Sequence, residues 1–147
     1  MSNLTYQRIF DENDSDIPKI KAVYQLRDVA QYISTGDNYF HYVTTTENVY
    51  YFKVFENERL IGATHLEKLG NTLFMDILVF CEYQRLGFGT QIVKDIQNGM
   101  LGLAYDQIEV SIDERNTASL KLFENAGFIR VSQDGELINL VYRKITG

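Results

Sequence analysis

The chain has 147 residues, of which 45% are hydrophobic and 23% charged, with ten glycines and a single proline. This composition excludes a disordered or collagen-like chain, and the length suits one globular domain over residues 1–147. The 14 basic and 20 acidic residues give a formal net charge of −6, which argues against a nucleic-acid partner because such partners favour a basic surface.

The first half of the chain predicts strands around one helical region. Residues Leu4–Phe10 are expected to form a short strand. Apolar residues recur at helical spacing from Asp16 to about Ser34, with Pro18 in the first turn, where its missing N–H is not needed. Three strands follow at Val49–Phe55, Leu60–Leu66 and Thr72–Phe80. Because short polar turns separate them, they predict an antiparallel meander.

The second half alternates helices and strands. The expected elements are a helix at Gly87–Met100, a strand at Ile108–Ile112, a helix at Asn116–Ala126, and strands at Phe128–Val131 and Leu137–Tyr142. Asn116 or Thr117 would cap the second helix, and Gly127 would end it. A strand–helix–strand step after a meander predicts a mixed α/β (α+β) sheet, partly parallel and flanked by helices.

Cysteine content and apolar runs limit the compartment and the chemistry. Cys81 is the only cysteine, so no intrachain disulfide can form, which favours a reducing compartment such as the cytoplasm. No stretch approaches the roughly 20 apolar residues of a membrane helix. His41 and His65 lie far apart, and no metal-ligand spacing is visible. We therefore expect a cytoplasmic protein without a membrane partner or a metal.

The most informative segment is Val79–Thr90, in which a strand ends, a glycine-containing loop follows and a helix begins. Gly87 and Gly89 let backbone N–H groups approach a ligand, and the helix N-terminus carries partial positive charge. Such a site suits a phosphate or pyrophosphate, with Arg85 adding a positive charge nearby. A plain glycine-containing turn is the alternative interpretation, because a short glycine motif is a weak signal.

Two common phosphate-binding motifs are absent from this segment. A Walker loop requires Gly-x-x-x-x-Gly-Lys-Ser/Thr, and no such run occurs. A dinucleotide fingerprint requires a third glycine three residues after Gly89, and that position is Ile92. The ligand of the loop must therefore be identified from other residues.

Two segments together resemble the GNAT acyl-CoA-dependent N-acetyltransferases. Gln84-Arg85-Leu86-Gly87-Phe88-Gly89 matches the Gln/Arg-x-x-Gly-x-Gly/Ala motif of that family. The segment Asn116–Phe128 is similar to the family's Asn-x-x-Ala-x-x-Leu-Tyr-x-x-x-Gly-Phe, with Ser119 at the alanine and Phe123 at the tyrosine position. The order of the expected elements and the length also resemble the family.

The resemblance implies a GNAT-like fold, whose mostly antiparallel central sheet contains a parallel strand pair that splays into a V-shaped gap. Acetyl-CoA would be the cosubstrate, with its pantetheine arm between Ile77–Phe80 and Ile108–Ile112 and its pyrophosphate at the backbone of Leu86–Thr90. The residues implied to contact acetyl-CoA are Ile77, Leu78, Val79, Gln84, Arg85, Leu86, Gly87, Phe88, Gly89, Thr90, Asn116, Ser119 and Phe123.

Val79 and Asp76 are the implied catalytic residues. The Val79 amide would face the thioester oxygen and stabilise the oxyanion that forms there. Asp76 interrupts an apolar strand, where burial would raise its pKa and suit it to accept a proton from the amine. A solvated strand face is the alternative for Asp76. Glu67 and Glu109 are weaker candidates for the same role.

Other residues carry two interpretations each. Asn116 would hydrogen-bond the pantetheine arm, cap its helix, or do both. Phe123 stands where many relatives have a tyrosine that protonates the thiolate, and it has no hydroxyl, so we interpret it as core.

His65 would titrate near neutral pH or serve structurally, and Cys81 is a bystander thiol rather than a covalent acyl carrier. An aromatic group would enclose the acceptor or form core and strands: Tyr39, Phe40, Tyr42, Tyr50 and Tyr51.

The expected activity is acetyl transfer from acetyl-CoA to a primary amine of a small molecule or a protein, by direct attack. A non-catalytic acyl-CoA sensor is the alternative, because Phe123 lacks the usual hydroxyl. A generic α/β interaction domain would require that the glycine loop binds nothing. A homodimer is one alternative for the assembly of the chain. The negative net charge of the chain would help to attract a cationic amine.

Overall fold

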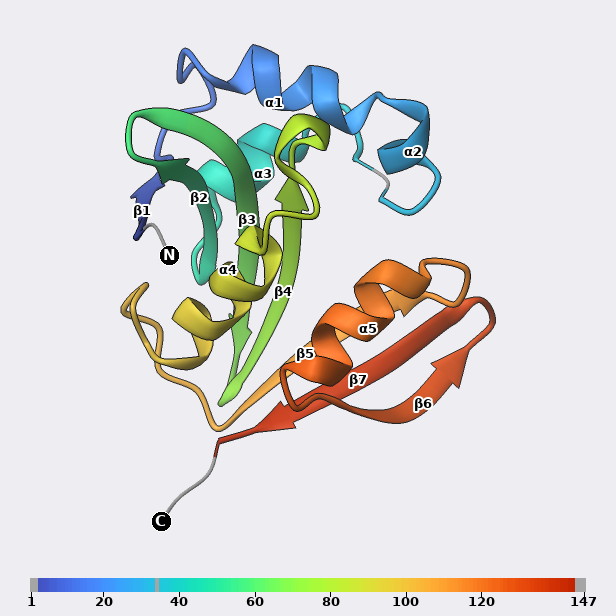
Figure 1. Ribbon diagram of the computed structural model, residues 1–147. Helices are drawn as coiled ribbons and strands as arrows, with labels where there is room; N and C mark the ends of the chain where they lie inside the picture. Colours follow the sequence, from blue (N-terminus) through green and yellow to red (C-terminus); the bar gives the residue numbers. More distant parts are fainter. Residues whose placement is uncertain (1–2, 34, 145–147) are drawn as a thin grey trace.

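In the computed structural model, which describes residues 3–33 and 35–144, a seven-stranded sheet runs through the chain in the order β1-β2-β3-β4-β5-β7-β6 (Figure 1). The strands are β1 (Leu4–Arg8), β2 (Val49–Glu56), β3 (Arg59–Leu69), β4 (Thr72–Val79), β5 (Gln107–Asp113), β6 (Ile129–Asp134) and β7 (Leu137–Arg143). Every neighbouring pair is antiparallel except β4 and β5, which are parallel. The predicted meander and mixed sheet are confirmed.

Helices cover both faces of the sheet. They are α1 (Ile17–Tyr24), α2 (Arg27–Ala30), α3 (Tyr39–Thr45), the short 3-10 helix η1 (Cys81–Tyr83), α4 (Phe88–Gln97) and α5 (Thr117–Asn125). One hydrophobic cluster joins α1, α2 and α3 to one face of the sheet, and a larger one joins α4 and α5 to the other. The two faces of β4 therefore belong to different cores.

The N-terminal helical region differs from the prediction. The single helix expected from Asp16 to about Ser34 is wrong, because α1 and α2 are separate helices and Leu26 between them is extended, with φ −64 and ψ 141. Ser34 lies outside the described residues. The sequence also gave no sign of α3, where Tyr39, Phe40 and Tyr42 lie on a helix rather than a strand. Aromatic and β-branched residues favour helices weakly, so packing decides there.

The second half matches the prediction more closely. Asn116 caps α5, and its side-chain oxygen accepts a hydrogen bond from the Ser119 N–H at 3.3 Å. Gly127 ends the helix with a φ of 94, a left-handed conformation that glycine adopts without strain. Helix α4 ends at Gln97, so Met100, expected on its buried stripe, lies beyond it and is 63% exposed.

The two parallel strands separate after three paired positions. Only Thr72–Phe74 of β4 pair with Gln107–Glu109 of β5. Beyond them β5 stays paired with β7 and β4 stays paired with β3, while the two strands diverge from each other (Figure 1). The implied splay is therefore present, but the separated part of β5 begins at Val110 and not at Ile108 as expected, because Ile108 and Glu109 still pair with β4.

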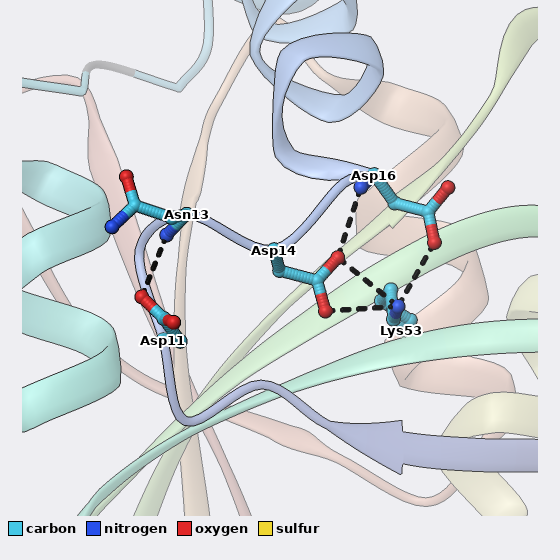
Figure 2. A network of polar contacts seen from close by, with 5 residues as sticks. All are labelled: Asp11, Asn13, Asp14, Asp16 and Lys53. Atoms are coloured by element: carbon cyan, nitrogen blue, oxygen red, sulfur yellow. Dashed lines mark hydrogen bonds and ion pairs between the residues drawn. The ribbon is translucent and has the colours of Figure 1, made fainter.

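An ion-pair network around the buried Lys53 fixes the segment that leads into α1 (Figure 2). The Lys53 ammonium donates to both Asp14 carboxylate oxygens at 3.1 Å and to Asp16 at 2.9 Å, while Lys53 is only 4% exposed. Burial lowers the pKa of Lys53, but the hydrogen bonds with Asp16 and Asp14 outweigh it, so the pKa lies above its usual value. The network ties the start of α1 to β2.

Candidate active site

A cleft of about 410 Å³ runs along the open edge of β4, and we call it the near cleft. Its walls come from α2, β4, η1, α4 and α5. The residues predicted from the sequence that line it are Ile77, Leu78, Val79, Gln84, Arg85, Phe88, Gly89, Asn116 and Ser119. The fold thus brings together two segments that are about 30 residues apart in sequence, as expected where a β–helix–β crossover intervenes.

The N-terminus of α4 forms one end of the near cleft. Arg85 and Gly87 have left-handed backbones, with φ 64 and φ 88, and this turn starts the helix. The first backbone bond of the helix runs from the Gln91 N–H to the Gly87 carbonyl at 3.1 Å. The N–H groups of Phe88–Thr90 have no hydrogen-bond partner among the described residues. Such free N–H groups, at the positive end of a helix dipole, suit an anion.

Three of the predicted loop residues, Leu86, Gly87 and Thr90, do not line the near cleft. The Leu86 side chain is 62% exposed. Gly89, in contrast, lies close to α5: a β-carbon there would come within 2.8 Å of the end of the Leu122 side chain. Of these four loop residues, only Gly89 therefore forms part of the wall of the near cleft.

The backbone of β4 is exposed to the near cleft around Val79. Beyond Phe74, β4 has no strand partner on its β5 edge. The Val79 carbonyl accepts a hydrogen bond from the Gln84 side chain at 3.0 Å. A β-carbon at Gly62 of β3 would overlap the Leu78 carbonyl oxygen, so only glycine lets β3 approach β4 this closely. An extended ligand that lies along this edge would find unpaired backbone groups, as in β-strand addition.

A smaller space of about 50 Å³, the apical cavity, lies between β4 and β5. Phe123 lines it but is only 2% exposed and packs against Phe128, with the ring centroids 5.1 Å apart. The structure therefore supports the interpretation of Phe123 as core. Asn116 lines both this cavity and the near cleft, and its amide nitrogen has no partner among the described residues. Capping α5 thus leaves that nitrogen free to donate to a ligand.

A third space of about 170 Å³, the far chamber, opens on the other side of the gap. It is lined by His65, Glu67, Phe74, Met75, Asp76, Glu109 and Ser111. Asp76 and Ser111 line both the far chamber and the apical cavity, which in turn shares Ile77, Asn116 and Ser119 with the near cleft. The three spaces therefore follow one another through the gap between β4 and β5, with Asp76 between the second and the third.

Asp76 is exposed to these spaces, and its carboxylate has no hydrogen-bond partner among the described residues. The surrounding protein nevertheless displaces much of its water. This burial raises the pKa of Asp76 above its usual value; the nearby His65 acts against it and the charge of Glu67 acts with it. A raised pKa brings a carboxylate closer to the range in which it can accept a proton from an amine.

His65 is held on both ring nitrogens. The Tyr39 hydroxyl lies 2.9 Å from Nδ1, and a Glu67 carboxylate oxygen lies 2.9 Å from Nε2. That same oxygen accepts a hydrogen bond from the Tyr42 hydroxyl at 2.9 Å. Register pairs His65 with Asp76 across β3 and β4. These contacts hold His65 in place in the wall of the far chamber. Its side chain is 13% exposed.

The predicted aromatic group divides between different roles. Tyr39 and Tyr42 contact the His65–Glu67 pair, while Phe40 and Tyr51 pack in the core below them. Tyr50 lies on the opposite face, where the Arg8 guanidinium stacks on its ring at 4.4 Å. Part of the group therefore lies beside the far chamber and part is core.

Several residues of the site were not found from the sequence. Tyr32 and Ile33 follow α2 and line both the near cleft and the apical cavity. The Arg115 guanidinium lies 5.7 Å from the Tyr32 ring centroid, so this contact spans the two sides of the gap. Arg115 also pairs with Asp113 at 2.9 Å, which lowers the pKa of Asp113 to about 2. Nothing in the helical spacing distinguishes Tyr32 from a core residue.

The described part of the chain has neither a cluster of metal ligands nor a membrane-spanning helix. Among residues 3–33 and 35–144, no group of three or more histidine, cysteine or acidic residues could hold a metal ion. Within the same residues no helix is both long and apolar enough to cross a membrane. Cys81, which lines the near cleft, is exposed and forms no disulfide.

The family described as the acetyltransferase (GNAT) domain matches residues 16–142 of the chain. A domain from Methanocaldococcus jannaschii has a similar structure, with a TM-score of 0.82 at 17% identity over 97% of this chain and 99% of that one. Spermidine N-acetyltransferase from Vibrio cholerae, in complex with CoA and spermine, has a TM-score of 0.79 at 16% identity, over 96% and 95% of the two chains.

The Campylobacter jejuni N-acetyltransferase PseH, in complex with acetyl coenzyme A, has a TM-score of 0.74 at 13% identity over 97% of this chain and 100% of that one. No functionally curated protein is similar enough in sequence to match. At these low identities the structural likeness concerns the fold.

Proposed function

The chain belongs to the GNAT acetyltransferase family, and we propose that it moves the acetyl group of acetyl-CoA to a primary amine by direct attack. The whole chain would act as a single catalytic domain. One observation carries the proposal: three neighbouring spaces share lining residues across the gap between β4 and β5, with unpaired β4 backbone along the near cleft and the unpartnered Asp76 carboxylate between the apical cavity and the far chamber. Two reactants can meet there from opposite sides of the sheet.

Acetyl-CoA is assigned to the near cleft. Its pyrophosphate would accept hydrogen bonds from the free N–H groups of Phe88–Thr90, with Arg85 adding positive charge. The pantetheine amides would pair with the open edge of β4, and the Asn116 amide nitrogen would donate to the arm. The structures of relatives with CoA or acetyl-CoA support this assignment.

The amine is assigned to the far chamber. A primary amine is protonated at neutral pH and must lose a proton before it can attack. Asp76 would take that proton, because its raised pKa and open position suit it to this role. The free nitrogen lone pair then attacks the thioester carbon, and the Val79 N–H would donate to the oxyanion that forms.

Collapse of the tetrahedral intermediate would release CoA as its thiolate and leave the acetyl group on the nitrogen, which gives its second proton to solvent to become the neutral amide. Phe123 has no hydroxyl and packs in the core, so it cannot protonate the sulfur. The thiolate would leave unprotonated and take a proton from water, which is acceptable because thiols ionise near neutral pH.

Two successive measurements test this function. Calorimetry with acetyl-CoA should show binding, and a thiol-release assay on a panel of primary amines should then show turnover that requires the amine. Absence of acetyl-CoA binding would overturn the assignment of the near cleft. Binding without release of CoA on a broad panel would overturn catalysis and indicate a protein that only binds acyl-CoA.

A further inference from the structure

Glu109 occupies the point at which β4 and β5 separate. It pairs with Phe74 in the last shared register position of the two strands. Asp76 lies two residues beyond Phe74 on the same face of β4, and both acidic residues line the far chamber. Strand rise and spacing place the Cα atoms of Glu109 and Asp76 about 8 Å apart. One small ligand in the far chamber can therefore contact both carboxylates.

Glu109 has no charged partner in the part of the chain that the structure describes. Among the described residues Glu109 has no hydrogen bond and no ion pair, whereas Glu67 in the same chamber holds His65 and Tyr42. Of the residues that line the far chamber, only His65 can become a cation, and Glu67 already contacts it. Two carboxylates without a partner in one chamber favour a ligand that brings positive charge.

We propose that Glu109 is a specificity-determining residue, which selects acceptor amines that carry a second positive charge. This inference rests on the proposed function. The reacting amine lies at Asp76, where it loses its proton, while the second cation pairs with Glu109 at the base of the gap. Phe74, which pairs with Glu109 and lies two residues before Asp76 on the same face of β4, gives an apolar wall to the alkyl chain that joins the two nitrogens.

Three acceptors of equal chain length test the selection. Putrescine, n-butylamine and γ-aminobutyrate each present a primary amine on a four-carbon chain, but the far end is cationic, apolar or anionic. With saturating acetyl-CoA, kcat/KM from thiol release should be highest for putrescine, lower for n-butylamine and lowest for γ-aminobutyrate. The advantage of putrescine over n-butylamine should be on the order of tenfold and should shrink as salt is added.

Glu109→Gln removes the charge and keeps the size of the side chain. It should lower kcat/KM for putrescine on the order of tenfold and leave n-butylamine within about twofold. Glu58→Gln, an exposed residue in the turn between β2 and β3, changes the net charge equally and should alter neither. Acetyl-CoA affinity should be unchanged in both variants.

Each outcome has one meaning. Equal kcat/KM for the three amines, or equal losses for putrescine and n-butylamine in Glu109→Gln, would overturn the selection while leaving the acetyltransferase activity intact. If none of the three amines releases CoA, calorimetric titration of putrescine and n-butylamine into the protein saturated with CoA decides the matter: tighter binding of putrescine supports the role of Glu109, and equal or absent binding overturns it. In that case the loss of turnover counts separately against the proposed function.

Discussion

Replacing Lys53 by methionine should destabilise the protein through the two carboxylates that it leaves behind. Lys53 is buried, with its side chain 6% exposed, and it neutralises Asp14 and Asp16, whose side chains are 21% and 35% exposed (Figure 2). Removing one partner of a fully buried ion pair costs roughly 3–5 kcal/mol. Because both aspartates keep contact with water, which screens their charge, we expect about 2–3 kcal/mol here.

Thermal unfolding followed by circular dichroism measures this effect. For a chain of this size each kcal/mol lowers Tm by about 2–4 °C, so Lys53→Met should lower Tm by roughly 8 °C. A matched control adds Asp14→Asn and Asp16→Asn to Lys53→Met. Because these changes remove the unpaired charges, the triple variant should recover about half of the loss. A Tm for Lys53→Met within 2 °C or so of the parent would refute the view that the network holds α1 to β2.

Three further predictions concern the proposed site. Gly89→Asp should weaken acetyl-CoA binding by more than about tenfold in calorimetry, because it places a crowded, negative side chain beside the free N–H groups of α4; unchanged affinity would mean that the pyrophosphate binds elsewhere. Asp76→Asn should lower kcat by on the order of a hundredfold while leaving acetyl-CoA affinity within about twofold, and equal turnover would remove Asp76 from the role of base. Since the pKa of Asp76 is raised, kcat/KM in the parent should fall as the pH drops through that raised pKa and protonates the carboxylate, and Asp76→Asn should lose this acid limb. An identical limb in the variant would assign the titration to another group.

The sequence predicts most of the sheet, because its strands alternate with turn residues that act locally. Asn116 and Gly127, which begin and end α5, are predictable for the same reason: a cap and a left-handed stop depend on their immediate neighbours. Helix α3 is not, because Tyr39 and Phe40 have weak helix preference and take their conformation from packing against Tyr51.

The site is predictable only in part. Its two motifs are short segments, so they can be found by reading along the chain. The far chamber is different, because Glu67, Asp76 and Glu109 come from three strands and become neighbours only through the sheet order and register. Each of the three was a candidate base by itself, but their separate environments, one paired and two unpartnered, follow from tertiary contacts.

The short joint between β4 and β5 gives a bound ligand a place at which it can add to the cohesion of the sheet. Only three register positions connect the β1–β4 half of the sheet with the half formed by β5, β6 and β7. A molecule bound along the open edge of β4 and touching α5 bridges those halves, so its binding free energy adds to the free energy of unfolding. By thermodynamic linkage, a ligand at a hundred times its Kd adds about 2.7 kcal/mol. The protein saturated with acetyl-CoA would then resist unfolding and proteolysis for longer than the free protein.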